Sequence, residues 1–123
     1  MLAPSNPFLS LAPILAVSGM SALLRGAAAR TLAVSPIIAG QAVKGPAAKL
    51  MRELGLAASS RAWAEYLDAR YPAWIDEWVL DRRDQAQARA LAARGFKVRT
   101  ADTLMHSDAQ KQSLARWLIE AGA

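Results

Sequence analysis

The sequence contains no cysteine and a single histidine, His106. Disulfide bonds, a thiol nucleophile and a cysteine-ligated metal site are therefore excluded for these 123 residues, as is a multi-histidine site within one copy. A long hydrophobic run is also lacking: the longest apolar stretch, Phe8 to Ser18, is interrupted by Pro13 and is shorter than the roughly 20 residues of a membrane span. A signal peptide has Lys or Arg before its apolar run, and no Lys or Arg precedes this one. We expect a soluble, cytoplasmic chain without a membrane partner.

Clustered positive charge is absent as well. The formal net charge is +5, from 15 basic and 10 acidic residues, but the basic residues are scattered and Arg82-Arg83 is their only adjacent pair. A nucleic-acid interface needs a basic face or stripe, so we expect no nucleic-acid partner. The excess of positive charge favours anionic small ligands such as phosphates.

The pattern of apolar residues, prolines and glycines predicts alternating helices and strands. Pro4, Pro7 and Pro13 argue against a regular helix before Ser18, which is itself a candidate N-cap. Short apolar runs predict strands, and helical spacing bounded by Ser, Pro or Gly predicts helices. The expected strands are 30–35, 75–80 and 96–100, and the expected helices are 18–26, 46–54, 60–71, 84–94 and 108–120.

This alternation predicts an α/β fold: a Rossmann-like parallel sheet with flanking helices, as part of a larger three-layer domain. In such sheets, ligands bind beyond the carboxyl ends of the strands. Those ends are the segments Ser35 to Lys44, Asp81, and Ala101 to His106. The first of them has the most glycine and proline, and it is the strongest candidate for a binding loop.

The segment from Ser35 and Pro36 through Gly40, Lys44, Gly45 and Pro46 reads as a strand end, a loop and a helix start. A helix start offers unpaired N–H groups and a positive dipole end, and Lys44 adds a full charge, so the segment is a candidate phosphate site. It lacks the order of a P-loop. An ordinary βα loop with a surface lysine fits the same residues.

A second candidate is the proline-stiffened loop that contains Ser5, Asn6 and Pro7. It presents a hydroxyl and an amide, both able to bond a phosphate or a ribose. A simple turn explains the same residues.

Other polar and aromatic residues receive no assigned role. Four aspartates, at 76, 81, 84 and 102, raise the possibility of a Mg²⁺ site, but each also fits a turn, cap or strand end. We assign no metal ligand and no catalytic residue, His106 included. The tryptophans at 63, 74, 78 and 117 are expected to pack in a core or in an oligomer interface.

Several stretches, taken in order, resemble the 2-phospho-L-lactate transferase family. The resemblance runs over most of the chain, and its most specific part is the Ala-Val-Ser-Pro-Ile-Ile stretch with the Lys-Gly-Pro-Ala-Ala-Lys stretch that follows. The stretches are 3–7, 11–17, 33–38 with Gly40, 44–49, 51–55 and 100–105.

The resemblance implies a role in making the deazaflavin coenzyme F-420. The family transfers a phosphorylated three-carbon acid from a GDP-activated donor to the hydroxyl of the deazaflavin Fo, with release of GMP and assistance from Mg²⁺. The resemblance also implies that Lys44 and the helix start at Pro46 hold anionic oxygens, and that Ser5 and Asn6 contact the nucleotide or the deazaflavin. Phospholactate, phosphoenolpyruvate and phosphoglycerate all stay open as donors.

The chain also departs from the family. Family members are longer, and their glycine-rich segment and metal-binding aspartates lie upstream of these residues, so we expect residues 1–123 to form the carboxy-terminal part of a single transferase domain. Ser18 replaces a usual Pro, and Ala39 replaces a usual Gly. The family also suggests a homodimer. The alternatives are a non-catalytic α/β fragment that binds a phosphorylated ligand and a dimerisation module with a Trp-rich surface.

Overall fold

A computed structural model describes residues 1–43 and 45–122. Its elements are η1 (Pro7–Leu11), α1 (Ala12–Leu15), α2 (Met20–Gly26), β1 (Leu32–Val34), β2 (Ile37–Ile38), β3 (Gln41–Ala42), α3 (Ala47–Glu53), α4 (Ser60–Arg70), β4 (Glu77–Asp81), η2 (Arg82–Asp84), α5 (Gln85–Ala93), β5 (Val98–Ala101) and α6 (Asp108–Gly122).

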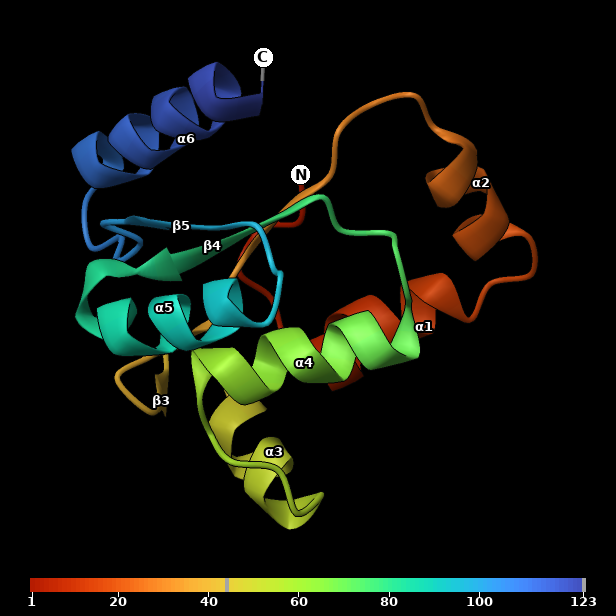
Figure 1. Ribbon diagram of the computed structural model, residues 1–123, viewed down its shortest axis with the longest axis horizontal. Helices are drawn as coiled ribbons and strands as arrows, with labels where there is room; N and C mark the ends of the chain where they lie inside the picture. The colour runs from red at the N-terminus through yellow and green to blue at the C-terminus, as the bar shows by residue number, and fades with distance from the viewer. Residues whose placement is uncertain (44, 123) are drawn as a thin grey trace.

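The central sheet is parallel and has the order β1-β4-β5. Leu2 adds an isolated parallel bridge to Ala33 at the outer side of β1. Helix α6 covers one face of this sheet, and α4 and α5 cover the other, so the molecule has three layers (Figure 1). The predicted α/β class with a parallel sheet and flanking helices is confirmed.

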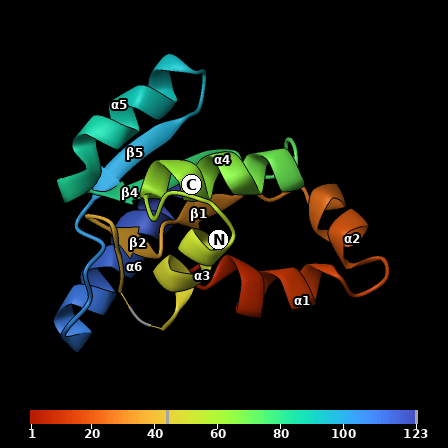
Figure 2. The ribbon, with the colours of Figure 1, turned by 90° about the horizontal axis from the view of Figure 1, so that it is seen from below.

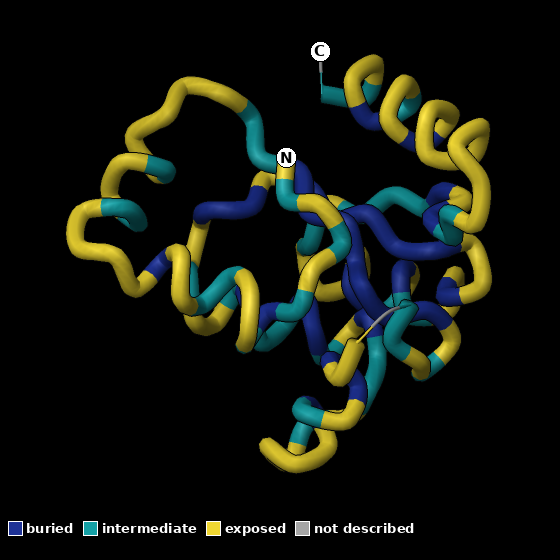
Figure 3. The backbone as a smooth tube through the Cα atoms, turned by 180° about the vertical axis from the view of Figure 1, so that it is seen from behind, coloured by how far each residue is buried: buried dark blue, intermediate teal, exposed yellow. Residues whose placement is uncertain are grey.

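Two apolar clusters, one on each face, hold the layers together. The larger cluster contains Trp63 of α4 and Trp78 of β4, whose rings meet edge to face with centroids 5.3 Å apart. The smaller cluster joins Val34 and Val79 to Leu114 and Leu118 of α6. The sheet is accordingly buried, while α6 and the segment around α2 are largely exposed on their outer sides (Figure 3).

The tryptophans do not form a surface. Trp63, Trp74 and Trp78 are buried in the larger cluster. Trp117 is half-buried, and the Arg99 guanidinium lies 5.0 Å from its ring centroid. The idea of a Trp-rich dimerisation surface is therefore wrong, because these side chains are used to pack helices onto the sheet.

The prediction that no regular helix precedes Ser18 is wrong. Pro7 and Pro13 lie within the first two positions of η1 and α1, where a missing N–H removes no intrahelical bond. Ser18 is not an N-cap either: Gly19, with φ +80°, precedes α2, and no side chain caps that helix. Ser59 and Ser107, by contrast, accept bonds from Ala62 N and Gln110 N and cap α4 and α6 as predicted.

No single helix among the described residues is long and apolar enough to cross a membrane. The two helical segments Pro7–Leu15 and Met20–Gly26 reach that length and apolar character only together, and they meet at a bend of 87°.

Candidate functional site

A hollow of about 530 Å³ opens at the carboxyl edge of the sheet. Its walls come from the loop before η1, the segments on either side of the β2–β3 hairpin, the start of α3, the segment after β5 and the first turn of α6. Figure 2 shows η1, α3 and the hairpin grouped on this side. The lining residues are Pro4, Ser5, Asn6, Leu9, Ser10, Pro36, Val43, Gly45, Pro46, Met105 and Lys111.

The hollow brings together five of the predicted site residues, from two segments about thirty residues or more apart in the chain. Ser5, Asn6, Pro36, Gly45 and Pro46 all line it. Gly45 has φ +71°, a conformation that favours glycine. Residues of the two candidate loops of the sequence thus line one hollow.

The other predicted residues lie elsewhere. Pro7 and Ser35 are buried in the protein, and Gly40 forms the turn of the β2–β3 hairpin. Lys44 lies outside the described residues. The binding roles of these four residues stay predictions.

Much of the polar capacity of Ser5 and Asn6 is used locally. Asn6 Oδ1 accepts bonds from Phe8 N at 2.9 Å and Leu9 N at 3.1 Å and so caps η1, while Ser5 Oγ donates to Ala3 O at 2.8 Å. Asn6 Nδ2 is buried and has no partner among the described residues. Ser5 is exposed, so its hydroxyl can still turn toward a ligand.

The sequence did not single out Leu9, Ser10, Val43, Met105 and Lys111. The rule that ligands bind at carboxyl strand ends placed Met105 near the site but did not select it. The Lys111 Nζ lies 2.9 Å from Asp108 Oδ1, one turn earlier on α6, and brings a cation to the rim. The sequence does not indicate that Lys111 faces the hollow, because the residues beside it on the first turns of α6 are equally polar.

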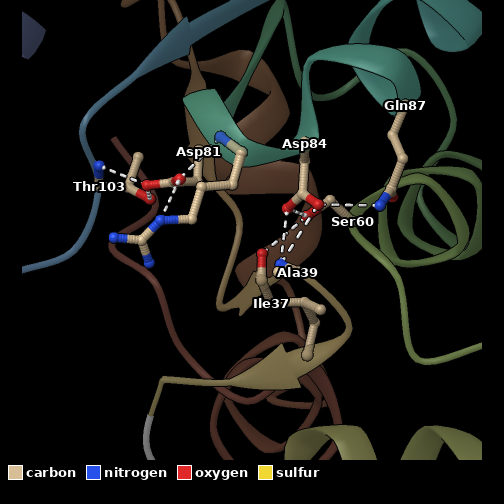
Figure 4. Close-up of polar contacts among 8 residues, drawn as sticks. Ile37, Ala39, Ser60, Asp81, Asp84, Gln87 and Thr103 are labelled. Carbon is tan, nitrogen blue, oxygen red and sulfur yellow. Dashed lines mark hydrogen bonds and ion pairs between the residues drawn. The ribbon is translucent and has the colours of Figure 1, made fainter.

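The two buried aspartates at the end of β4 do not converge on a metal site. Asp81 accepts bonds from Thr103, and Asp84 lies among Ser60, Ala39 and Gln87 (Figure 4). Residues 1–43 and 45–122 contain no group of three or more His, Asp or Glu side chains that could hold a metal ion. These described residues therefore do not fit a Mg²⁺ site.

Comparison with known proteins agrees with the resemblance seen in the sequence. The model of the family described as 2-phospho-L-lactate transferase CofD matches residues 1–119. A 2-phospho-L-lactate transferase of Methanosarcina acetivorans is 40% identical over 119 residues, which are 97% of this chain and 37% of the relative. The Methanosarcina barkeri transferase is 41% identical, with the same coverage.

A phosphoenolpyruvate transferase of Mycolicibacterium smegmatis is 36% identical over 106 residues, which are 85% of this chain and 31% of that protein. The chain thus spans about a third of the length of the curated relatives it matches. The order of the matched residues, together with the α/β fold that they form, leads to one conclusion: this chain belongs to the 2-phospho-L-lactate transferase family.

Proposed function

We propose that this chain is the acceptor-binding part of a transferase in coenzyme F-420 biosynthesis. The enzyme moves a phosphorylated three-carbon acid from a GDP-activated donor to the hydroxyl of the deazaflavin Fo. The observation that carries the proposal is the hollow at the carboxyl edge of the sheet, which brings together residues of the two loops that resemble the family. Residues 1–123 act as the carboxy-terminal part of one transferase domain.

The walls of the hollow support a flat aromatic ligand. Leu9, Pro36, Val43, Pro46 and Met105 present apolar surfaces, which gain free energy by removing an aromatic ring from water. A volume of about 530 Å³ lies within the range of small-molecule pockets.

Polar groups lie at the margin of the same hollow. Ser5 and Ser10 offer hydroxyls for a polyhydroxy chain, and Lys111 offers a cation for an anionic oxygen. We propose that Ser5 and Asn6 contact the acceptor, and that Lys44, Gly45 and Pro46 face the anionic oxygens of the donor.

The transfer forms one bond and breaks one. The acceptor hydroxyl oxygen bonds to the phosphorus that carries the three-carbon acid, the bond from that phosphorus to GMP breaks, and the hydroxyl proton is released. Such reactions require positioning and charge neutralisation more than covalent participation by the protein. Among the residues of this chain, the proposed contribution is to hold and orient the acceptor, and we propose that any Mg²⁺ is held by other parts of the enzyme.

The names of the relatives leave the donor open. The Methanosarcina proteins are named for phospholactate and the Mycolicibacterium protein for phosphoenolpyruvate. We propose a donor of this phosphorylated three-carbon class, and a homodimer as the assembly.

Binding of Fo to the purified chain, followed by fluorescence polarisation with and without GDP and Mg²⁺, tests the proposal. We expect saturable binding that Met105→Ala weakens about tenfold, because that side chain forms part of the apolar wall. Met20→Ala is the matched control, since Met20 is also half-buried but lies on α2 outside the hollow. A folded chain that binds no Fo, or equal weakening by both variants, contradicts the assignment of this hollow to the acceptor.

A further inference from the structure

Two wall residues of the hollow are tied to each other. The β2–β3 hairpin pairs Ile37 with Ala42 and Ile38 with Gln41, and just beyond it the Val43 N–H donates to the Pro36 carbonyl at 3.1 Å. Pro36 and Val43 both line the hollow. The position of the hairpin therefore sets where Pro36 and Val43 lie relative to the other lining residues, such as Leu9 and Met105.

The hairpin ends in a strained turn. Its two central residues, Ala39 and Gly40, have φ values of +49° and +78°, which is the pattern of a turn that favours Asn, Asp or Gly. The Ala39 N–H donates to the Asp84 carboxylate, with nitrogen–oxygen distances of 3.2 and 3.3 Å. The carboxylate thus holds the turn from outside the hairpin.

The base of the hairpin is held by two buried serines. Ser60 Oγ lies 2.7 Å from the Ile37 carbonyl oxygen, 2.9 Å from Asp84 Oδ2 and 3.0 Å from Ser35 Oγ. Ser35 Oγ accepts from Ile37 N and lies 3.1 Å from Ile37 O. Each hydroxyl has one hydrogen, so Ser60 can donate to only one of its two acceptors at a time, and both the Ile37 carbonyl and the Asp84 carboxylate lie within hydrogen-bond distance of it.

Asp84 connects these contacts. Its side chain is 3% exposed, accepts a further bond from Gln87 Nε2 at 2.9 Å, and forms no ion pair among the described residues (Figure 4). Burying a carboxylate without a cation is costly for folding, and an apolar side chain would pack at lower cost. The arrangement is better explained by what the carboxylate holds in place than by stability.

We infer that Asp84, acting through Ser60 and the Ala39 amide, is a positioning residue that fixes the Pro36–Val43 wall of the hollow. The expected effect of Asp84 on Fo binding rests on the proposed acceptor function. The expected effect of Asp84 on the hairpin does not. Asp84 touches no ligand itself, because it does not line the hollow.

The experiment compares Ser60→Ala with Ser59→Ala in the full chain. Both remove one hydroxyl at the start of α4, but Ser59 caps the helix through Ala62 N and makes no contact with the hairpin. The first readout is amide hydrogen exchange of Val43, whose N–H bonds to Pro36. The second readout is the Kd for Fo. Asp84→Asn, which keeps one acceptor oxygen, and Asp84→Ala complete the series.

We expect Ser60→Ala and Asp84→Ala to speed Val43 exchange at least tenfold and to weaken Fo binding about tenfold, with Asp84→Asn in between. Ser59→Ala leaves both unchanged apart from a general loss of stability. Unchanged Val43 exchange in Ser60→Ala, or equal acceleration in Ser59→Ala, overturns the inference. Faster exchange with no Fo binding by the unmodified chain retains the positioning role and rejects the proposed acceptor instead.

Discussion

Asp81 and Thr103 join the end of β4 to the segment that follows β5. Asp81 Oδ2 accepts one bond from the Thr103 backbone N–H at 3.0 Å and another from its hydroxyl at 3.1 Å, and both residues are buried. The chain two residues further on carries Met105 into the hollow. This pair therefore helps to position the part of the hollow that Met105 forms.

Thr103→Val keeps the side-chain shape and removes the hydroxyl. We expect a loss of about 2 kcal/mol in the free energy of unfolding, because a bond to a buried carboxylate is lost. Thr103→Ser keeps the hydroxyl and should lose about 1 kcal/mol, the value of one methyl group. Thr100→Val is the control, since its hydroxyl bonds Gln85 on the exposed surface. Urea unfolding measures all three, and equal losses at Thr103 and Thr100 would contradict the role of the pair.

Ala39→Gly should stabilise the protein. Ala39 is exposed and has φ +49°, a conformation that costs an L-residue about 1–2 kcal/mol, so glycine should gain about 0.5–1 kcal/mol after its own entropy cost. Ala69→Gly, in the exposed part of α4, should instead lose about 1 kcal/mol. Thermal unfolding should show midpoint temperatures that shift in opposite directions for the two variants. A lower midpoint for Ala39→Gly would contradict the proposed strain at Ala39.

The fully buried carboxylate of Glu77 is bonded by Arg30 and Arg99 at the opposite edge of the sheet. Both arginines also donate to the Ala121 carbonyl, which ties the end of α6 to β1 and β5. Arg99→Ala and Arg30→Ala should each lose about 2 kcal/mol, and the double variant should lose more than the sum, because Glu77 is then buried without a cation.

Arg116→Ala, at an exposed position of α6, is the control for these variants and should change stability by less than about 0.5 kcal/mol. Urea unfolding at one pH provides the comparison. Strict additivity of the two single losses would show that the two arginines act independently of each other and would contradict their shared role at Glu77.

Glu65 makes part of the free energy of unfolding depend on pH. Hydrogen bonding and charge from Arg61, followed by the charge of Arg94, hold the pKa of Glu65 below its ordinary value of 4.5. A carboxyl whose pKa is lower in the folded state stabilises the fold above its unfolded pKa, and this contribution is lost as the pH falls through the folded pKa. Glu65→Gln should therefore be less stable than the unmodified chain at pH 7, with the difference shrinking at pH 3.

The control is Glu53→Gln, which removes an exposed carboxylate on α3. Urea midpoints at the two pH values separate the variants. A difference at Glu65 that stays constant between pH 7 and pH 3 would contradict the shifted pKa.

The sequence alone was enough to predict the elements whose signals are local. The helix α4 has a serine cap and apolar residues at helical spacing, and the buried strand β4 has the apolar run Trp78 to Leu80 at its centre, so propensity and burial favour the same structure. The alternation of these elements was enough to predict the parallel sheet. The family could also be identified, because stretches such as 33–38 resemble it in order along the chain.

Local signals were insufficient at the amino-terminal helices and the hairpin. Pro7 and Pro13 stop a helix only when they lie inside it, and their position within the first two residues of η1 and α1 is set by the caps and packing around them. The β2–β3 hairpin has two-residue strands and an alanine in its turn. Its stability comes from Asp84 and Ser60, which lie more than twenty residues away in the chain.

The sequence by itself determined the α/β class, the parallel sheet with flanking helices and the two loops whose residues line the hollow. Only the tertiary structure decided which of their residues share a hollow and which are buried. Ser35 and Ser5 are both serines in candidate loops, yet one is bonded inside the protein and the other is exposed at the hollow. The physical reason is that burial and hydrogen-bond partners depend on how elements that are distant in the sequence pack together. Asp84 of η2, for example, bonds the Ala39 amide of the hairpin and Ser60 of α4, and no local sequence pattern predicts these contacts.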